Sequence, residues 1–146
     1  MRTIKFRAKN YNGEWLFGYL MPTNKPTYHI NNKYSISISS NSLNYPERYF
    51  YEVDTDTIGQ FTGLYDSYGK EIFEGDVVCF DDTPYCTYGN KYQGVVVEHR
   101  GAWCVKHYEE WGDEYFYSPL FADDFASYKT TILGNVYDNP RTIERR

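Results

Sequence analysis

The stretch LYDSYGKEIFEGDVVCF, residues 64–80, decides how this chain is interpreted, because two turn signals in it precede an apolar run. In the first turn, DSYG at 66–69, an aspartate can accept bonds from nearby backbone amides and Gly69 can supply a positive φ. The second, Gly75-Asp76, stands directly before VVCF, which is typical of a buried strand. Glycine tolerates dihedral angles that are closed to other residues, and an aspartate can cap a neighbouring amide. We therefore predict that Gly69, Gly75 and Asp76 shape the fold rather than form an active site.

The first twenty residues predict a β-hairpin. Apolar residues alternate with polar and basic ones over 3–9, as in a half-buried strand, so Ile4, Phe6 and Ala8 are expected to face the core. Asn12-Gly13 is a strong hairpin signal. The segment EWLFGYL at 14–20 then has the composition of the returning strand.

The rest of the chain predicts short strands separated by loops. Residues 22–50 contain three prolines and a Ser/Asn-rich run, so we expect a long excursion with one weak strand around Tyr34–Ile38. Further elements are expected as a loop at 81–92, paired strands at 94–98 and 102–108, an acidic loop, a short helix around 119–127, and a last strand that Pro140 ends.

No segment shows a sustained helical period, and short strands recur between Gly and Asn/Asp turns. This pattern predicts an all-β or β-dominated fold, with an N-terminal hairpin and a partial SH3-like barrel. We expect a single domain over 1–146. Within it, 1–60 would form the hairpin and excursion, 61–140 the barrel part, and 141–146 a basic tail.

Composition bounds the setting in which the protein works. The net charge of −5 disfavours nucleic acid and anionic membranes for the molecule as a whole, although basic residues gather at both ends and acids between 106 and 125. The N-terminus has no apolar run like that of a signal peptide, and no stretch is long enough to span a membrane. With three cysteines, Cys79, Cys86 and Cys104, these features predict free thiols in the bacterial cytoplasm.

Three blocks together resemble one known family. IKFRAKN…GEWLFGYL at the start, IGQFTGLYDSYGKEIFEGDVV in the middle and ILGNVYDNP near the end are similar, in the same order, to the signature blocks of the YopX family of phage and prophage proteins. The resemblance implies a phage-encoded, cytoplasmic, self-associating protein, with a trimer as one expected assembly. It supplies no catalytic or cofactor-binding residues. Residues 22–50, residues 81–92 and the tail RTIERR do not match the family's blocks.

Metal and catalytic sites are poorly supported by the sequence. Cys104 and His107 are three residues apart, which on a strand places them on opposite faces. Asp54 and Asp56 would share a face if VDTDT were extended, but a nuclease-like metal site needs a third acid and a Lys or His. There is no nucleophile elbow or phosphate loop. We predict no enzyme activity, no cofactor and no metal.

Two binding functions remain. The chain has 29 aromatic residues, more than one small core can house, so some should lie on the surface and mark contacts with a second copy or with a host or phage protein. The expected contributors to this interface are Trp111, Tyr115, Phe116 and Tyr117. The alternative is single-stranded or structured nucleic acid, which the basic row Lys5, Arg7 and Lys9 would contact.

Overall fold

The computed structural model describes residues 3–22, 34–39, 48–81, 91–108, 114–120 and 130–139, and almost all of its regular structure is β-strand. This confirms the predicted β-dominated fold. The chain divides into two compact units, residues 1–61 and 62–146.

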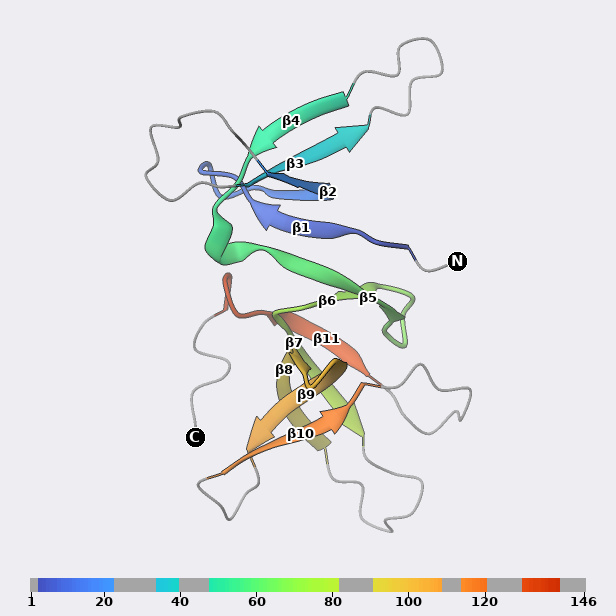
Figure 1. Ribbon diagram of the computed structural model, residues 1–146. Helices are drawn as coiled ribbons and strands as arrows, with labels where there is room; N and C mark the ends of the chain where they lie inside the picture. Colours follow the sequence, from blue (N-terminus) through green and yellow to red (C-terminus); the bar gives the residue numbers. More distant parts are fainter. Residues whose placement is uncertain are drawn as a thin grey trace. The chain divides into compact units, whose positions relative to one another are not determined.

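The strands and one short 3₁₀ helix follow one another along the chain as Figure 1 labels them. Their bounds are β1 Phe6–Lys9, β2 Trp15–Pro22, β3 Tyr34–Ser39, β4 Arg48–Glu52, η1 Thr55–Thr57, β5 Gly59–Tyr65, β6 Glu71–Phe73, β7 Asp76–Asp81, β8 Lys91–His99, β9 Ala102–Tyr108, β10 Tyr115–Pro119 and β11 Thr131–Asn135. The hydrogen-bonded order is β4-β3-β2-β1-β5-β6 in one sheet and β10-β9-β8-β7-β11 in the other.

The predicted N-terminal hairpin is confirmed as β1 and β2, which pair antiparallel from Phe6 opposite Gly18 to Lys9 opposite Trp15. Its turn depends on the side chain of Asn10, whose Oδ1 accepts from the amides of Asn12, at 3.0 Å, and Glu14, at 2.9 Å. Gly13 has φ 82°, the left-handed conformation that closes a three-residue hairpin loop.

The first unit buries one face of its sheet. Its core is formed by Ala8, Ile36 and Val53, with half-buried apolar side chains packed around them, namely Leu16, Leu20, Tyr34 and Ile58. The strand predicted around Tyr34–Ile38 is therefore central, because β3 pairs with β2 on one side and β4 on the other. The prediction for Ile4 is wrong, since 57% of this residue is exposed before β1 begins.

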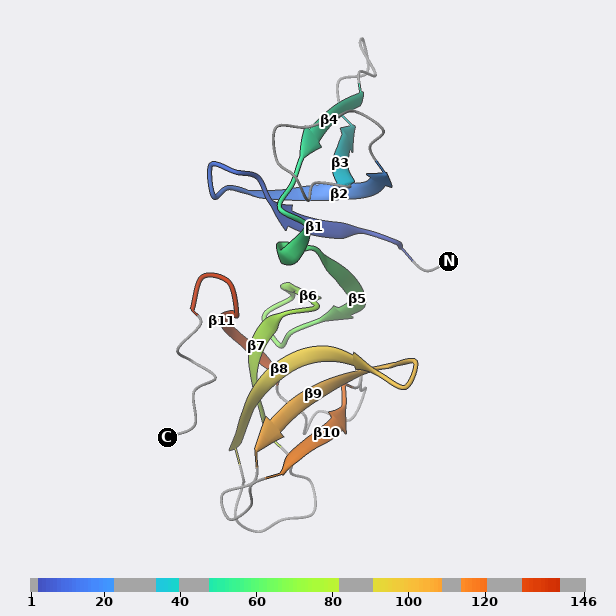
Figure 2. The same ribbon diagram turned by 60° about the vertical axis from the view of Figure 1, so that its left-hand side comes forward.

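The second unit has a separate core and an open antiparallel sheet. Ile72, Val78, Val96 and Val105 are buried together, with Leu64, Trp103, Leu120 and Ile132 packed around them. The β8–β9 hairpin closes through Arg100, φ 50°, and Gly101, φ 81°. Within the described residues β10 and β11 lie at opposite ends of the strand order, and Figure 2 shows β8, β9 and β10 side by side. The sheet is not closed, so the predicted partial SH3-like barrel is not confirmed.

The stretch 64–80 is held by the side chains of its two aspartates, Asp66 and Asp76. Asp66 Oδ1 accepts from the amides of Tyr68, at 2.9 Å, and Lys70, at 2.8 Å, while Gly69 has φ 79°. The same carboxylate reaches the amide of Ile132 at 3.3 Å, which ties the turn to β11. Asp76 is buried, and its Oδ2 accepts from the amide of Phe73 at 2.8 Å.

Gly75 lies between these turns in a conformation that requires glycine. Its φ is 87°, its amide donates to the Val96 carbonyl at 2.9 Å, and its carbonyl accepts from the Val136 amide at 3.0 Å. The residue thereby links β7 to β8 and to the turn after β11. These contacts are structural, as expected for a bend that the fold requires.

Several predictions need correction or lie outside the described residues. Residues 115–119 form strand β10, not part of an acidic loop, and β4 was missed within the expected excursion. The predicted helix around 119–127 does not begin at Pro119, which ends β10. Other predicted features lie outside the described residues. These are residues 121–127 of that helix, most of the loop at 81–92, Cys86, Trp111, Pro140 and the tail at 141–146.

Candidate binding surfaces

Three consecutive aromatic side chains are exposed on β10. The exposed fraction is 44% for Tyr115, 38% for Phe116 and 40% for Tyr117, although successive residues of a strand point to opposite faces. Rings are therefore exposed on both sides of this strand. In the described part of the second sheet β10 is an edge strand, and we call these three residues the β10 edge. Of the predicted interface residues, only Trp111 cannot be placed.

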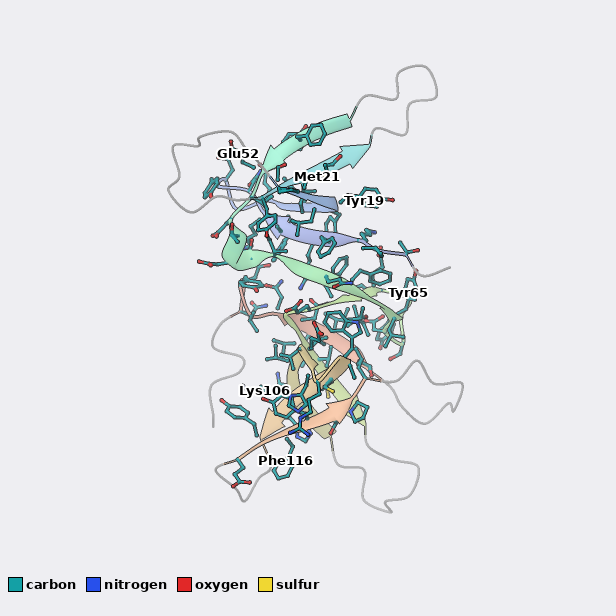
Figure 3. All side chains as sticks on the ribbon, viewed as in Figure 1. Tyr19, Met21, Glu52, Tyr65, Lys106 and Phe116 are labelled. Carbon is teal, nitrogen blue, oxygen red and sulfur yellow. The ribbon has the colours of Figure 1, made fainter. Side chains whose placement is uncertain are left out.

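Neighbouring side chains order the rings of the β10 edge. The Lys106 ammonium lies 4.1 Å from the centroid of the Tyr115 ring, a cation–π contact. Tyr117 stacks on His99, with centroids 3.7 Å apart and ring planes 9° apart. Figure 3 labels Lys106 and Phe116 on this part of the second unit. Rings held in this way lose little conformational entropy on binding.

The backbone of β10 also presents hydrogen-bonding groups. The Leu120 amide donates to the Trp103 carbonyl at 2.9 Å, so Leu120 and Trp103 form a hydrogen-bonded pair of the β9–β10 ladder. Such pairs alternate with non-hydrogen-bonded pairs in an antiparallel sheet. Tyr117, opposite Lys106, belongs to the second kind. Its N–H and C=O therefore point away from β9, toward the side where another strand could pair.

A second surface lies on the first unit, on the sheet face opposite the Ala8–Ile36 core. We call it the outer face. The basic residues Lys5, Arg7 and Lys9 form one row on β1 and its approach, and the next row on β2 contains Trp15, Phe17, Tyr19 and Met21. The exposed fraction is 45% for Phe17 and 60% for Tyr19. Figure 3 labels Tyr19 and Met21 on β2 and Glu52 on β4.

Cation–π contacts join these two rows. The Lys5 ammonium is 5.9 Å from the Phe17 ring centroid, and the Lys9 ammonium is 5.3 Å from that of Trp15. The Arg7 guanidinium carbon lies 4.7 Å from the same Trp15 ring. Arg7 lies on the same face as Lys5 and Lys9, as the alternation predicted, but it is only 8% exposed. The large Trp15 ring, which lies opposite Lys9 on β2 and diagonally across from Arg7, covers the guanidinium.

Small and large side chains alternate across the remaining strands of the outer face. Ser37 on β3 lies opposite Tyr19 on one side and Phe50 on the other. Phe50 is 58% exposed, whereas Ser37 is buried. A row of small hydroxyl side chains thus runs between two rows that carry exposed rings.

Charge is divided unequally between the two units. Residues 1–61 contain seven Lys and Arg against five Asp and Glu, a net of +2, whereas residues 62–146 contain eight against fifteen, a net of −7. The acids of the first unit affect one corner of it. Partial burial, followed by the carboxylates of Asp54, Glu52 and Asp56, raises the pKa of Tyr11.

The residues considered for metal or nucleophilic chemistry are not arranged for it. Cys104 and His107 lie on opposite faces of β9 and are both buried, and burial raises the pKa of the Cys104 thiol. Residues 54–56 do not continue as one extended segment, because Asp54 caps the 3₁₀ turn η1 by accepting from the Asp56 amide at 3.1 Å. Among the residues that the structure describes, no three His, Cys, Asp or Glu side chains gather as a metal site. No described helix is long and apolar enough to cross a membrane.

The exposed aromatic rows of the outer face were not predicted from the sequence. The signal was present in WLFGYLM at 15–21, where large side chains at 15, 17, 19 and 21 alternate with Leu16, Gly18 and Leu20. Because both sets are apolar, alternation alone did not identify which set faces the core. Only the pairing with β1 and β3 does so.

The fold and these surfaces define a class: a strand-dominated protein of two compact units, with open antiparallel sheets and exposed aromatic side chains on both. The chain belongs to the YopX family, whose model, described as YopX protein, matches residues 5–144. A similar solved structure is the crystal structure of protein EF1440 from Enterococcus faecalis. The two share 22% sequence identity, with 99% of this chain and 100% of that chain covered and a TM-score of 0.49. No curated protein matches the chain.

Proposed function

We propose that the protein acts by binding rather than catalysis, as a phage or prophage accessory protein in the bacterial cytoplasm. In this proposal it associates with copies of itself through the β10 edge and presents the assembled molecule to a host or phage protein. The observation that carries the proposal is the exposure of Tyr115, Phe116 and Tyr117 on a single edge strand.

Two physical arguments favour a second copy as the occupant of the β10 edge. Edge strands pair readily with another strand, and aromatic side chains beside the added strand supply most of the contact energy. In addition, a unit of net +2 and a unit of net −7 in the same chain favour a head-to-tail contact, in which unlike units of two copies meet. Pairing of β10 with β10 of a second copy about a two-fold axis gives a dimer, whereas a head-to-tail contact gives a closed ring such as a trimer.

Light scattering coupled to size-exclusion chromatography tests the proposal, since one chain has a mass of 17.3 kDa. We expect the wild type to give a multiple of this mass. The double variant Tyr115→Ser, Phe116→Ser should return to the mass of one chain. Tyr68→Ser is the matched control, because Tyr68 is 83% exposed but lies in a turn. A single-chain mass for the wild type at tens of micromolar, or an unchanged oligomer in the double variant, would refute the proposed interface.

Affinity purification from infected cells tests for a further protein partner. The bound material is compared with and without nuclease treatment. Proteins that remain bound after nuclease support the proposal, and recovery of nucleic acid without any specific protein contradicts it.

A further inference from the structure

We propose that the outer face of the first unit binds single-stranded nucleic acid, with unpaired bases stacked on its exposed rings and a phosphate held by Lys5. The surface is separate from the β10 edge and does not depend on self-association. Three of its rings, those of Phe17, Tyr19 and Phe50, are 45%, 60% and 58% exposed. Exposed rings on a sheet accept bases of any identity, because every base has a π-face.

The register leaves these rings accessible. Tyr19 and Phe50 lie on either side of Ser37, one strand away from it in each direction. Neighbouring strands are about 4.8 Å apart, so the two aromatic residues start about 10 Å apart, with only a hydroxymethyl group between them. Phe17 and Tyr19 are two residues apart on β2, which places them about 7 Å apart on the same face. Successive bases of an extended strand can therefore meet successive rings.

The cations are positioned beside these rings. The Lys5 ammonium is 5.9 Å from the Phe17 centroid, so a base stacked on Phe17 brings its phosphate near a positive charge. Arg7 contributes little direct contact because it is buried beneath Trp15. Glu52, Asp54 and Asp56, which act on Tyr11, repel phosphates from the Tyr11 turn. The strand is thereby expected to run along the Lys5 end of the face.

The unequal charge of the two units answers the main objection to nucleic acid as a ligand, which is the negative net charge of the whole chain. The whole chain is at −5, but the unit that carries the outer face is at +2. Lysines lie beside the rings, which suits a polar, anionic ribbon better than a continuous apolar protein surface. The observations therefore favour single-stranded nucleic acid over a protein on this face.

Fluorescence anisotropy with a labelled twenty-nucleotide oligo(dT) at low salt tests the proposal, and a duplex of the same length is the comparison. We expect saturable binding of the single strand and weaker binding of the duplex. Tyr19→Ala and Phe50→Ala should each weaken binding roughly five- to hundred-fold, the range for loss of one stacked base. Lys5→Ala should lower affinity and reduce the salt dependence by about 0.7 in log–log slope, as for one phosphate contact.

Tyr65→Ala is the matched control, because Tyr65 is 61% exposed but belongs to the second unit, and it should bind like the wild type. Circular dichroism establishes that each variant is folded. Three results would each overturn the proposal: no binding of oligo(dT) at 100-fold molar excess of protein, equal binding of the duplex, or full binding by the Tyr19→Ala, Phe50→Ala double variant. A change in oligomer mass in that double variant, without any loss of nucleic-acid binding, would assign the face to a protein contact and contradict the proposal as well.

Discussion

Replacing Gly75 with alanine should destabilise the second unit by about 2–3 kcal/mol. At φ 87°, a residue with a Cβ incurs about 1–2 kcal/mol of backbone strain. An added Cβ would also lie 3.1 Å from Cε2 of Tyr137, a tight contact that adds about 1 kcal/mol. The backbone cannot relax freely, because hydrogen bonds to Val96 and Val136 hold Gly75 on both sides.

Gly63→Ala separates the two contributions. Gly63 lies in the same unit with φ 84°, but an added Cβ there meets nothing within 4 Å. In urea denaturation followed by circular dichroism, the free energy of unfolding of Gly63→Ala should be about 1–2 kcal/mol lower than that of the wild type. That of Gly75→Ala should be lower still. A Gly75→Ala variant as stable as the wild type, or less affected than Gly63→Ala, would refute the argument that this bend shapes the fold.

Three further predictions concern the second unit and its thiols. Asp66→Ala should lower the free energy of unfolding by about 2 kcal/mol or more in the same assay, since three amides lose a charged acceptor. A loss no larger than that of Ser67→Ala would contradict this prediction. Because burial raises the pKa of the Cys104 thiol, its thiolate is scarce at pH 8. The thiol should therefore react with Ellman's reagent far more slowly in the native protein than in denaturant. Equal reaction rates in the two states would contradict this prediction. EDTA should leave the melting temperature unchanged, and a fall on chelation, or stoichiometric metal by elemental analysis, would reveal a metal site.

Local signals were enough to predict much of the fold. Alternation together with Asn12-Gly13 located the first hairpin, and the apolar run after Gly75-Asp76 located β7. Each depends on residues close in sequence, whose turn chemistry allows few conformations. The strand around Ile36 was also recognised, but its central place was not, because neither of the strands flanking it in the sheet could be inferred from the serine-rich segment itself.

Features set by distant contacts could not be predicted in the same way. β10 contains three aromatic residues in succession, so it shows no alternation, and it adjoins an acidic segment that suggested a loop. Alternation predicted the face on which Arg7 lies, but it could not predict that Trp15 from the next strand covers the side chain. Whether the second sheet closes into a barrel likewise depends on long-range strand pairing, which a pattern of strands and turns does not determine.

Hydrogen–deuterium exchange across a range of protein concentrations tests the central claim, association through the β10 edge, most directly. The Tyr117 N–H points away from β9, so pairing with a second copy should protect it. Peptides covering 114–120 should therefore exchange more slowly as concentration rises, while those covering the turn at 66–69 should not change. Exchange in 114–120 that is independent of concentration, in a range where scattering shows the mass to increase, would place the interface elsewhere and contradict the claim.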